Sequence, residues 1–82
     1  MDNSFEVPVT HNGHDYLFPA TLITYGYSYK IEVDVSGTII IFEPDDEGNY
    51  RALINEAQLH DIPHVNKELL QLIAEKLQAL FS

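Results

Sequence analysis

Glycine-containing turns at regular intervals constrain this chain more than any other feature of its sequence. Asn12-Gly13 is the preferred pair for a two-residue type I′ hairpin loop, because both central positions adopt positive φ. Gly26 gives a second turn signal and Ser36-Gly37 a third. This spacing predicts three successive hairpins, in which each strand runs antiparallel to the one before it.

The apolar residues of the first hairpin alternate in step with its turn. If Asn12-Gly13 forms the loop, His11 faces His14 and the other pairs follow in register. Opposed residues share a face and successive residues alternate between faces, so the large apolar groups of both strands fall on one side. The predicted pairs are Val9 with Tyr16, Val7 with Phe18 and Phe5 with Ala20.

The next two turns preserve the same apolar face. Residues 27–35 alternate between apolar and polar side chains, as an antiparallel strand with one solvated side does. A two-residue loop at either Tyr25-Gly26 or Gly26-Tyr27 keeps their apolar set on the face already defined. Local turn chemistry and the longer-range pattern therefore agree on a β-meander. The pairs predicted around Ser36-Gly37 are Val33 with Ile40 and Ile31 with Phe42.

The rest of the chain predicts a further strand, a connector and a helix. Residues 44–49 read as a turn, Tyr50–Ile54 as a shorter strand that closes the sheet, and 55–63 as a connector with room for one helical turn. Asn66 is a good N-cap, and apolar residues recur at helical spacing after it, which predicts a helix from about Lys67 to Leu80. Its apolar residues are Leu69, Leu70, Ile73, Leu77, Leu80 and Phe81.

The predicted fold is a single α+β domain over residues 1–82. It is an antiparallel β-meander of four to five strands with one C-terminal amphipathic helix packed on one face. Eighty-two residues leave room for one hydrophobic core, and the absence of cysteine excludes disulfides and thiol chemistry. No basic and apolar leader is visible and no apolar run reaches the ~18 residues of a membrane span, so a cytoplasmic location without membrane contact is expected.

Net charge restricts the possible partners. Thirteen acidic residues against four Lys and Arg give a formal net charge of -9 at pH 7. Such a field repels phosphate backbones, whose binding depends on Lys and Arg, so direct nucleic-acid binding is not expected. The charge favours a basic partner.

The second face of the predicted sheet is not uniformly polar, and one helix can cover only one face. Ile39-Ile40-Ile41 is a continuous apolar run, which is typical of a strand covered on both sides. If nothing covers this face, its apolar patch marks an interaction surface. The 55–63 connector, a second copy of the chain, a protein partner and a small molecule are the alternatives for its cover. The apolar residues predicted there are Leu17, Pro19, Ile23, Ile39 and Ile41.

Tyrosines gather around the second turn. Tyr25 and Tyr27 lie at the loop itself and are candidate contact residues, because tyrosine combines a large rigid surface with a polar tip. Tyr16 and Tyr29 are expected at the edge of the core, with their hydroxyl groups reaching solvent.

Two clusters of polar residues offer weaker hypotheses. Acidic residues surround the turn before Gly48 without the EF-hand pattern, so they predict a solvated turn or, alternatively, an acidic surface that mimics nucleic acid. His11 and His14, opposed with Cβ atoms ~5 Å apart, are weak candidates for a metal site. Turn-flanking histidines are usually surface residues, so neither a metal nor another cofactor is assigned. The acidic residues are Glu43, Asp45, Asp46 and Glu47.

The sequence shows no nucleophile elbow, glycine-rich phosphate loop or basic cluster, so catalysis is not expected. The leading hypothesis is a non-enzymatic protein-interaction module, homodimeric or partner-bound through the face that the helix leaves uncovered. The alternatives are an acidic inhibitor that blocks a basic site and a weak metal-binding domain using His11 and His14.

Overall fold

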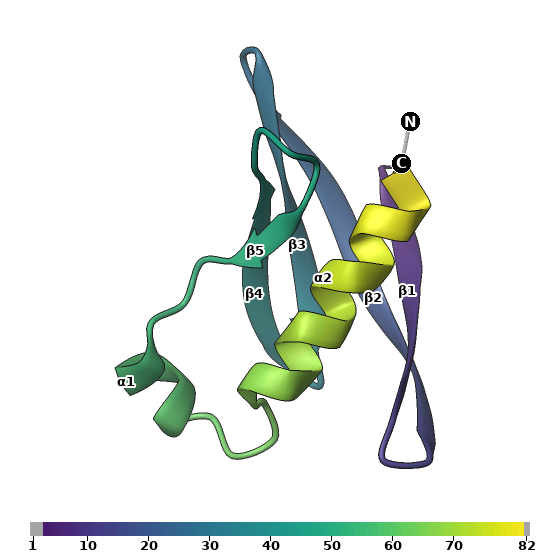
Figure 1. Cartoon of the computed structure of the whole chain (residues 1–82), viewed down its shortest axis with the longest axis vertical. Helices are drawn as coiled ribbons and strands as arrows, with labels where there is room; N and C mark the ends of the chain where they lie inside the picture. The colour runs from purple at the N-terminus through teal and green to yellow at the C-terminus, as the bar shows by residue number, and fades with distance from the viewer. Residues whose placement is uncertain (1–2, 82) are drawn as a thin grey trace.

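The computed structural model describes residues 3–81, and the side chains of Tyr25 and Glu56 fall outside that description. Five strands form one antiparallel sheet in the order of the sequence, and a helix lies across one of its faces (Figure 1). This arrangement confirms the predicted α+β meander with a C-terminal helix. The elements are β1 (Ser4–His11), β2 (His14–Tyr25), β3 (Ser28–Val35), β4 (Thr38–Pro44), β5 (Tyr50–Ala52), α1 (Glu56–His60) and α2 (Lys67–Phe81).

Three two-residue loops set the register of the first four strands. Asn12 and Gly13 have φ of 51° and 79°, as a type I′ loop requires. Of the two alternatives for the second loop, Gly26-Tyr27 is correct, because Tyr25 pairs with Ser28. The predicted pairing across the first and third loops is confirmed, from Phe5 with Ala20 to Ile31 with Phe42.

Pro19 marks the place where the ladder between β2 and β3 ends. β2 pairs with β1 from His14 to Thr21, but its pairing with β3 begins only at Ala20. A proline has no N–H to donate, so a strand with neighbours on both sides loses a ladder hydrogen bond where proline occurs. The turn end of the β1–β2 hairpin accordingly diverges from β3, and the sheet curves around α2 (Figure 1).

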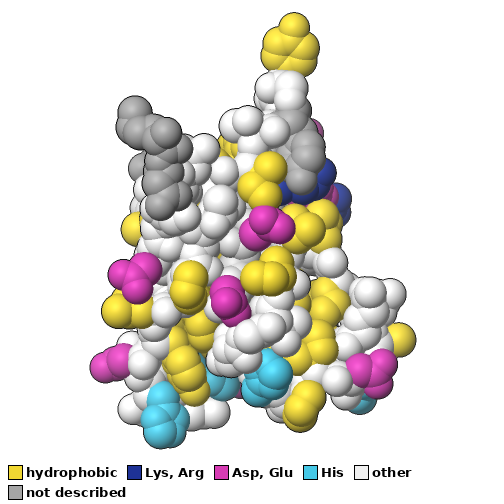
Figure 2. Space-filling model, turned by 180° about the vertical axis from the view of Figure 1, so that it is seen from behind, with side chains coloured by type: hydrophobic (Ala, Val, Ile, Leu, Met, Phe, Trp, Pro, Cys, Tyr) yellow, Lys and Arg dark blue, Asp and Glu magenta, His cyan; other side chains and the backbone are white. Residues whose placement is uncertain are grey.

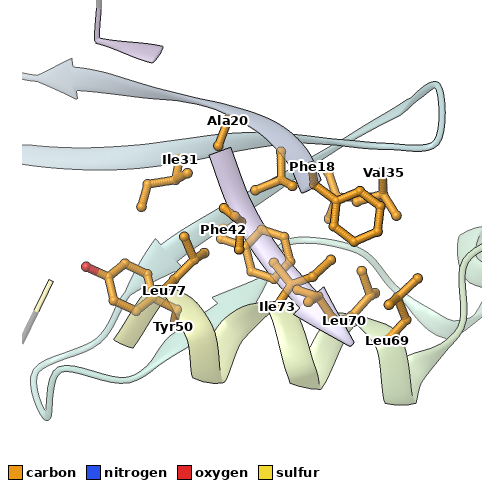
Figure 3. Packing of buried hydrophobic residues seen from close by; sticks show 14 of the residues in the cluster. Phe18, Ala20, Ile31, Val35, Phe42, Tyr50, Leu69, Leu70, Ile73 and Leu77 are labelled. Atoms are coloured by element: carbon orange, nitrogen blue, oxygen red, sulfur yellow. The ribbon is translucent and has the colours of Figure 1, made fainter. Parts of the chain in front are cut away.

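Helix α2 closes the open side of this curved sheet. Its start is fixed by Asn66, whose side-chain oxygen accepts the N–H of Leu69 at 2.8 Å. The helix contacts both edge strands, β1 and β5. Leu70, Ile73 and Leu77 point from α2 into the layer that holds Phe42 (Figure 3). Within residues 3–81, no helix combines the length and the hydrophobicity needed to cross a membrane.

The connector between β5 and α2 contributes to the same core. Asn55 caps α1 through a capping box, in which the Gln58 N–H donates to the Asn55 side chain at 2.7 Å and the Asn55 N–H donates to the Gln58 side chain at 3.1 Å. Leu59 and Ile62 pack against the core cluster between the sheet and α2. Leu59 and Ile62 of the connector thus lie on the helix side of the sheet.

Candidate interaction surface

The sheet face opposite α2, named the outer face here, mixes apolar and acidic side chains. Across β3 and β4, Glu32 lies opposite Ile41 and Asp34 lies opposite Ile39. Figure 2, which views the molecule from behind, shows hydrophobic patches separated by carboxylates. Each isoleucine of β4 on this face therefore has a carboxylate as its cross-strand neighbour.

The outer face stays open to solvent in this chain. Leu17 is 62% exposed and Ile39 is 55% exposed, which are high values for large aliphatic side chains in strands. Ile23 and Ile41 are half-buried among their neighbours, and Pro19 is exposed. Since Leu59 and Ile62 pack on the other side, the connector does not supply the cover that was one alternative.

Leu53 extends this apolar surface and was missed by the sequence analysis. Its N–H donates to the carbonyl oxygen of Ile41 at 2.7 Å, so the two residues are neighbours, and its side chain is 44% exposed. The five-residue turn before β5 fixes no register, so the face of Leu53 was not predictable from a loop. The alternation of Arg51 and Leu53 with Tyr50 and Ala52 was the available signal.

The β2–β3 turn projects beyond the rest of the sheet (Figure 1). Tyr27 in this loop is fully exposed, whereas the side chain of Tyr25 lies outside the described residues. The sequence between Asp15 and Glu32 contains no acidic residue. The tip is therefore an aromatic projection without negative charge on an otherwise acidic chain.

The four acidic residues near Gly48 have different environments. Asp45 is part of the turn itself, because its Oδ1 accepts the N–H groups of Glu47 and Asn49, both at 2.9 Å. Glu43 lies in β4, where its carboxylate accepts hydrogen bonds from Arg51 at 2.8 and 2.5 Å. Asp46 and Glu47 are exposed in the turn.

The two histidines of the first hairpin have different environments. His14 is exposed, but His11 is buried, and the expectation of a surface position is wrong for His11. His11 shares the core face of β1 with Val9, and its Nε2 lies 3.4 Å from the carboxylate of Glu68 in the first turn of α2. No group of three or more potential ligands is placed around a metal position within the described part of the chain.

Aromatic rings close the core at the C-terminal end of α2. The hydroxyl groups of Tyr29 and Tyr50 are 2.5 Å apart, and the ring of Phe81 lies within 6.4 Å of both rings. Burial raises the pKa of Tyr50 above its ordinary value, and the hydrogen bond with Tyr29 raises it further. Phe5 of β1 meets Phe81 edge-to-face at 5.5 Å, so the cluster joins both edge strands to the helix.

Comparisons of the chain with protein-family models, with curated proteins and with solved structures found no match. Two features of the chain bear on its function, the open outer face and the carboxylates on it.

Proposed function

We propose that this chain is a non-enzymatic protein-interaction module that binds a basic protein partner through its outer face. The observation that carries the proposal is the exposure of Leu17 and Ile39 on a face that neither α2 nor the connector covers. Both side chains share this sheet face with carboxylates, and an exposed apolar surface rimmed by polar groups marks an interaction site. A cytoplasmic location and the absence of catalysis belong to the same proposal.

The charges of the outer face favour a basic partner over a second copy of the chain. Glu6, Glu32, Asp34 and Glu43 lie on it beside two basic residues, Lys30 and Arg51, and Arg51 is paired with Glu43. Two copies meeting through this face would bring together two surfaces on which carboxylates outnumber basic groups, in chains that each carry a net charge of -9. A partner with aliphatic residues flanked by Lys and Arg complements both features.

Site-specific photocrosslinking tests this function. Benzoylphenylalanine replaces Ile39 in one variant and Leu80 in the matched control, since Leu80 is similarly exposed but lies on α2. In native extract of the cells that encode the chain, we expect the Ile39 variant alone to label one protein with a basic contact surface. The product should decline as salt is raised, because salt screens surface charges.

Three outcomes of this experiment contradict the proposal. A crosslink from position 39 to a second copy of the chain would replace the basic partner by a homodimer. Equal labelling from both positions would show that the outer face is not selective. A lack of any product from position 39 would leave the outer face without a partner.

An acidic inhibitor that occupies a basic site is the more specific form of this function. The exposed carboxylates of Asp46 and Glu47 support it, since they have no role in the turn that Asp45 closes. The double substitution Asp46→Asn and Glu47→Gln separates the two forms. An inhibitor should lose affinity in this variant, whereas binding centred on Leu17 and Ile39 should keep it.

A further inference from the structure

The two edges of the sheet differ in whether their backbone can accept another strand. Leu22 donates its N–H to the carbonyl oxygen of Asn3 at 3.1 Å. The backbone N–H and C=O groups of the odd-numbered residues of β1 therefore point toward β2, and those of the even-numbered residues point away from the sheet. Pro8 stands in the middle of this outward row and has no N–H. Proline at such a position blocks edge-to-edge pairing, so β1 is protected.

The edge at β5 carries no such protection. The Leu53 N–H points to β4, where it donates to Ile41, so the N–H and C=O groups of Tyr50 and Ala52 point the other way. No backbone hydrogen bond of the described residues occupies this side of Ala52. Backbone groups in a partly apolar setting require partners, which a further strand would supply.

This open side of β5 borders a groove between β5, the connector and α2. The groove has a cavity volume of about 330 Å³, at the lower end of the range for ligand sites. Its walls are more apolar than polar, with Ala52 and Ile54 on one side and Leu70 and Ala74 on the other. An apolar side chain that enters between them is removed from water.

The described side chains that line the groove carry positive charge and no negative charge, unlike the chain as a whole. They include Arg51 and Lys67 and no carboxylate. Arg51 is matched by Glu43, but no ion pair of Lys67 occurs among the side chains described in residues 3–81. The groove therefore suits an apolar ligand that carries a negative charge near Lys67.

We propose that this groove binds an extended, apolar and acidic peptide segment of a partner protein. The segment adds to the free edge of β5 as a further strand, hydrogen-bonds to the backbone of Ala52 and places alternate apolar side chains against Leu70 and Ala74. A carboxylate of the segment pairs with Lys67. Pairing between two copies through β5 is disfavoured, because the lining of each groove has no described carboxylate that could pair with Lys67 of the other copy.

Peptide selection on the full chain tests this proposal, which goes beyond the function of the outer face. A random linear-peptide library displayed on phage is selected on the immobilised protein, and the affinity of a selected peptide is measured by fluorescence polarisation. We expect selected sequences that alternate apolar residues and contain Asp or Glu. Lys67→Glu should weaken their binding about tenfold, the effect of losing one charged contact.

Three further variants separate the groove from the rest of the surface. Gln71 is exposed and lines the groove, so Gln71→Trp should fill it and abolish binding without disturbing the core. Glu75 is exposed on the same helix but faces the protected edge at β1, so Glu75→Trp should leave the affinity unchanged. Ala52→Pro removes the outward N–H and should also abolish binding, with an amide NMR spectrum as the check that the fold is kept.

Several results would overturn the proposal that the groove binds a peptide. A failure to select any peptide, or binding that survives Gln71→Trp, would overturn the groove. Peptides that lose affinity in Ile39→Lys but not in Gln71→Trp would belong to the outer face, which would support the proposed function and refute this inference. A dimer that Gln71→Trp dissociates would replace the peptide by a second copy of the chain.

Discussion

The hydroxyl groups of Tyr29 and Tyr50 meet at 2.5 Å beside the ring of Phe81, where the C-terminal end of α2 closes the core. Tyr50 is buried, and burial is the main reason that its pKa is raised. An unfolded tyrosine loses its proton near pH 10, whereas the folded chain retains that proton to higher pH. The unfolded state therefore gains stability relative to the folded state once the pH passes about 10.

We predict that the free energy of unfolding falls as the pH is raised from about 8 to about 11, and that Tyr50→Phe reduces this fall. Urea unfolding at several pH values measures it. Tyr27→Phe is the matched control, because Tyr27 is fully exposed and should leave the slope unchanged. An identical slope in Tyr50→Phe and the parent chain would show that Tyr50 does not cause the alkaline loss.

The packing of α2 gives a second prediction. Ile73 is fully buried against the sheet, so Ile73→Ala should lower the free energy of unfolding by about 2 to 5 kcal/mol, through lost burial and the cavity left behind. Leu80→Ala on the exposed side of the same helix should change it by only about 0.5 kcal/mol. Urea denaturation followed by circular dichroism compares the two. Equal effects would contradict the assignment of the helix faces.

The loop conformations give a third prediction. Gly13 has φ of 79° and an added Cβ would meet nothing within 4 Å, so Gly13→Ala should cost about 1 to 2 kcal/mol through backbone strain alone. Ser36 has φ of 54° without being glycine, so Ser36→Gly should be neutral or stabilising. Thermal unfolding measures both changes. A neutral Gly13→Ala would mean that the loop does not hold its positive φ.

The protection of β1 gives a fourth prediction. Pro8→Val restores an outward N–H in the middle of a strand edge, so this variant should self-associate where the parent chain does not. Light scattering at increasing protein concentration detects the change. Pro63→Val, an exposed proline in the connector, serves as the control. A Pro8→Val chain that scatters like its control would show that another feature protects this edge.

The sequence predicted the sheet well because its register is set locally. A two-residue loop at Asn12-Gly13 or Ser36-Gly37 fixes which residues oppose each other, and the alternating pattern then assigns every face. β5 was less well predicted, since the turn before it is longer and the strand ends at Ala52 instead of Ile54. The end of the β2–β3 ladder at Pro19 was a readable signal that the prediction did not use.

Features that depend on how α2 and the connector cross the sheet could not be predicted from the sequence. His11 is buried because the first turn of α2 lies over the end of β1, and no local pattern encodes that crossing. The groove beside β5 likewise depends on the path of the connector, which brings Leu59 and Lys67 to the same lining. The sequence also did not show that the connector packs on the helix side of the sheet, which leaves the outer face uncovered.

The contrast between Ile39 and its neighbour Ile40 gives the last prediction. Ile39 is 55% exposed on the outer face, whereas Ile40 is 4% exposed and lies opposite Val33 in the core. Ile40→Thr places a hydroxyl group in the core and removes methyl groups, so it should lower the free energy of unfolding by about 2 kcal/mol or more. Ile39→Thr keeps a β-branched side chain at the surface and should change it by about 0.5 kcal/mol or less.

Urea denaturation of the two variants therefore tests the exposure of the outer face without any knowledge of the partner. The same substitution at adjacent positions cancels the effects of strand propensity, because both replacements keep the branch at Cβ. A difference of the predicted size means that the chain does not need Ile39 to fold, which leaves this side chain available for binding. If Ile39→Thr destabilised the chain as much as Ile40→Thr, position 39 would already be covered, and the outer face would have no free aliphatic centre to offer a partner.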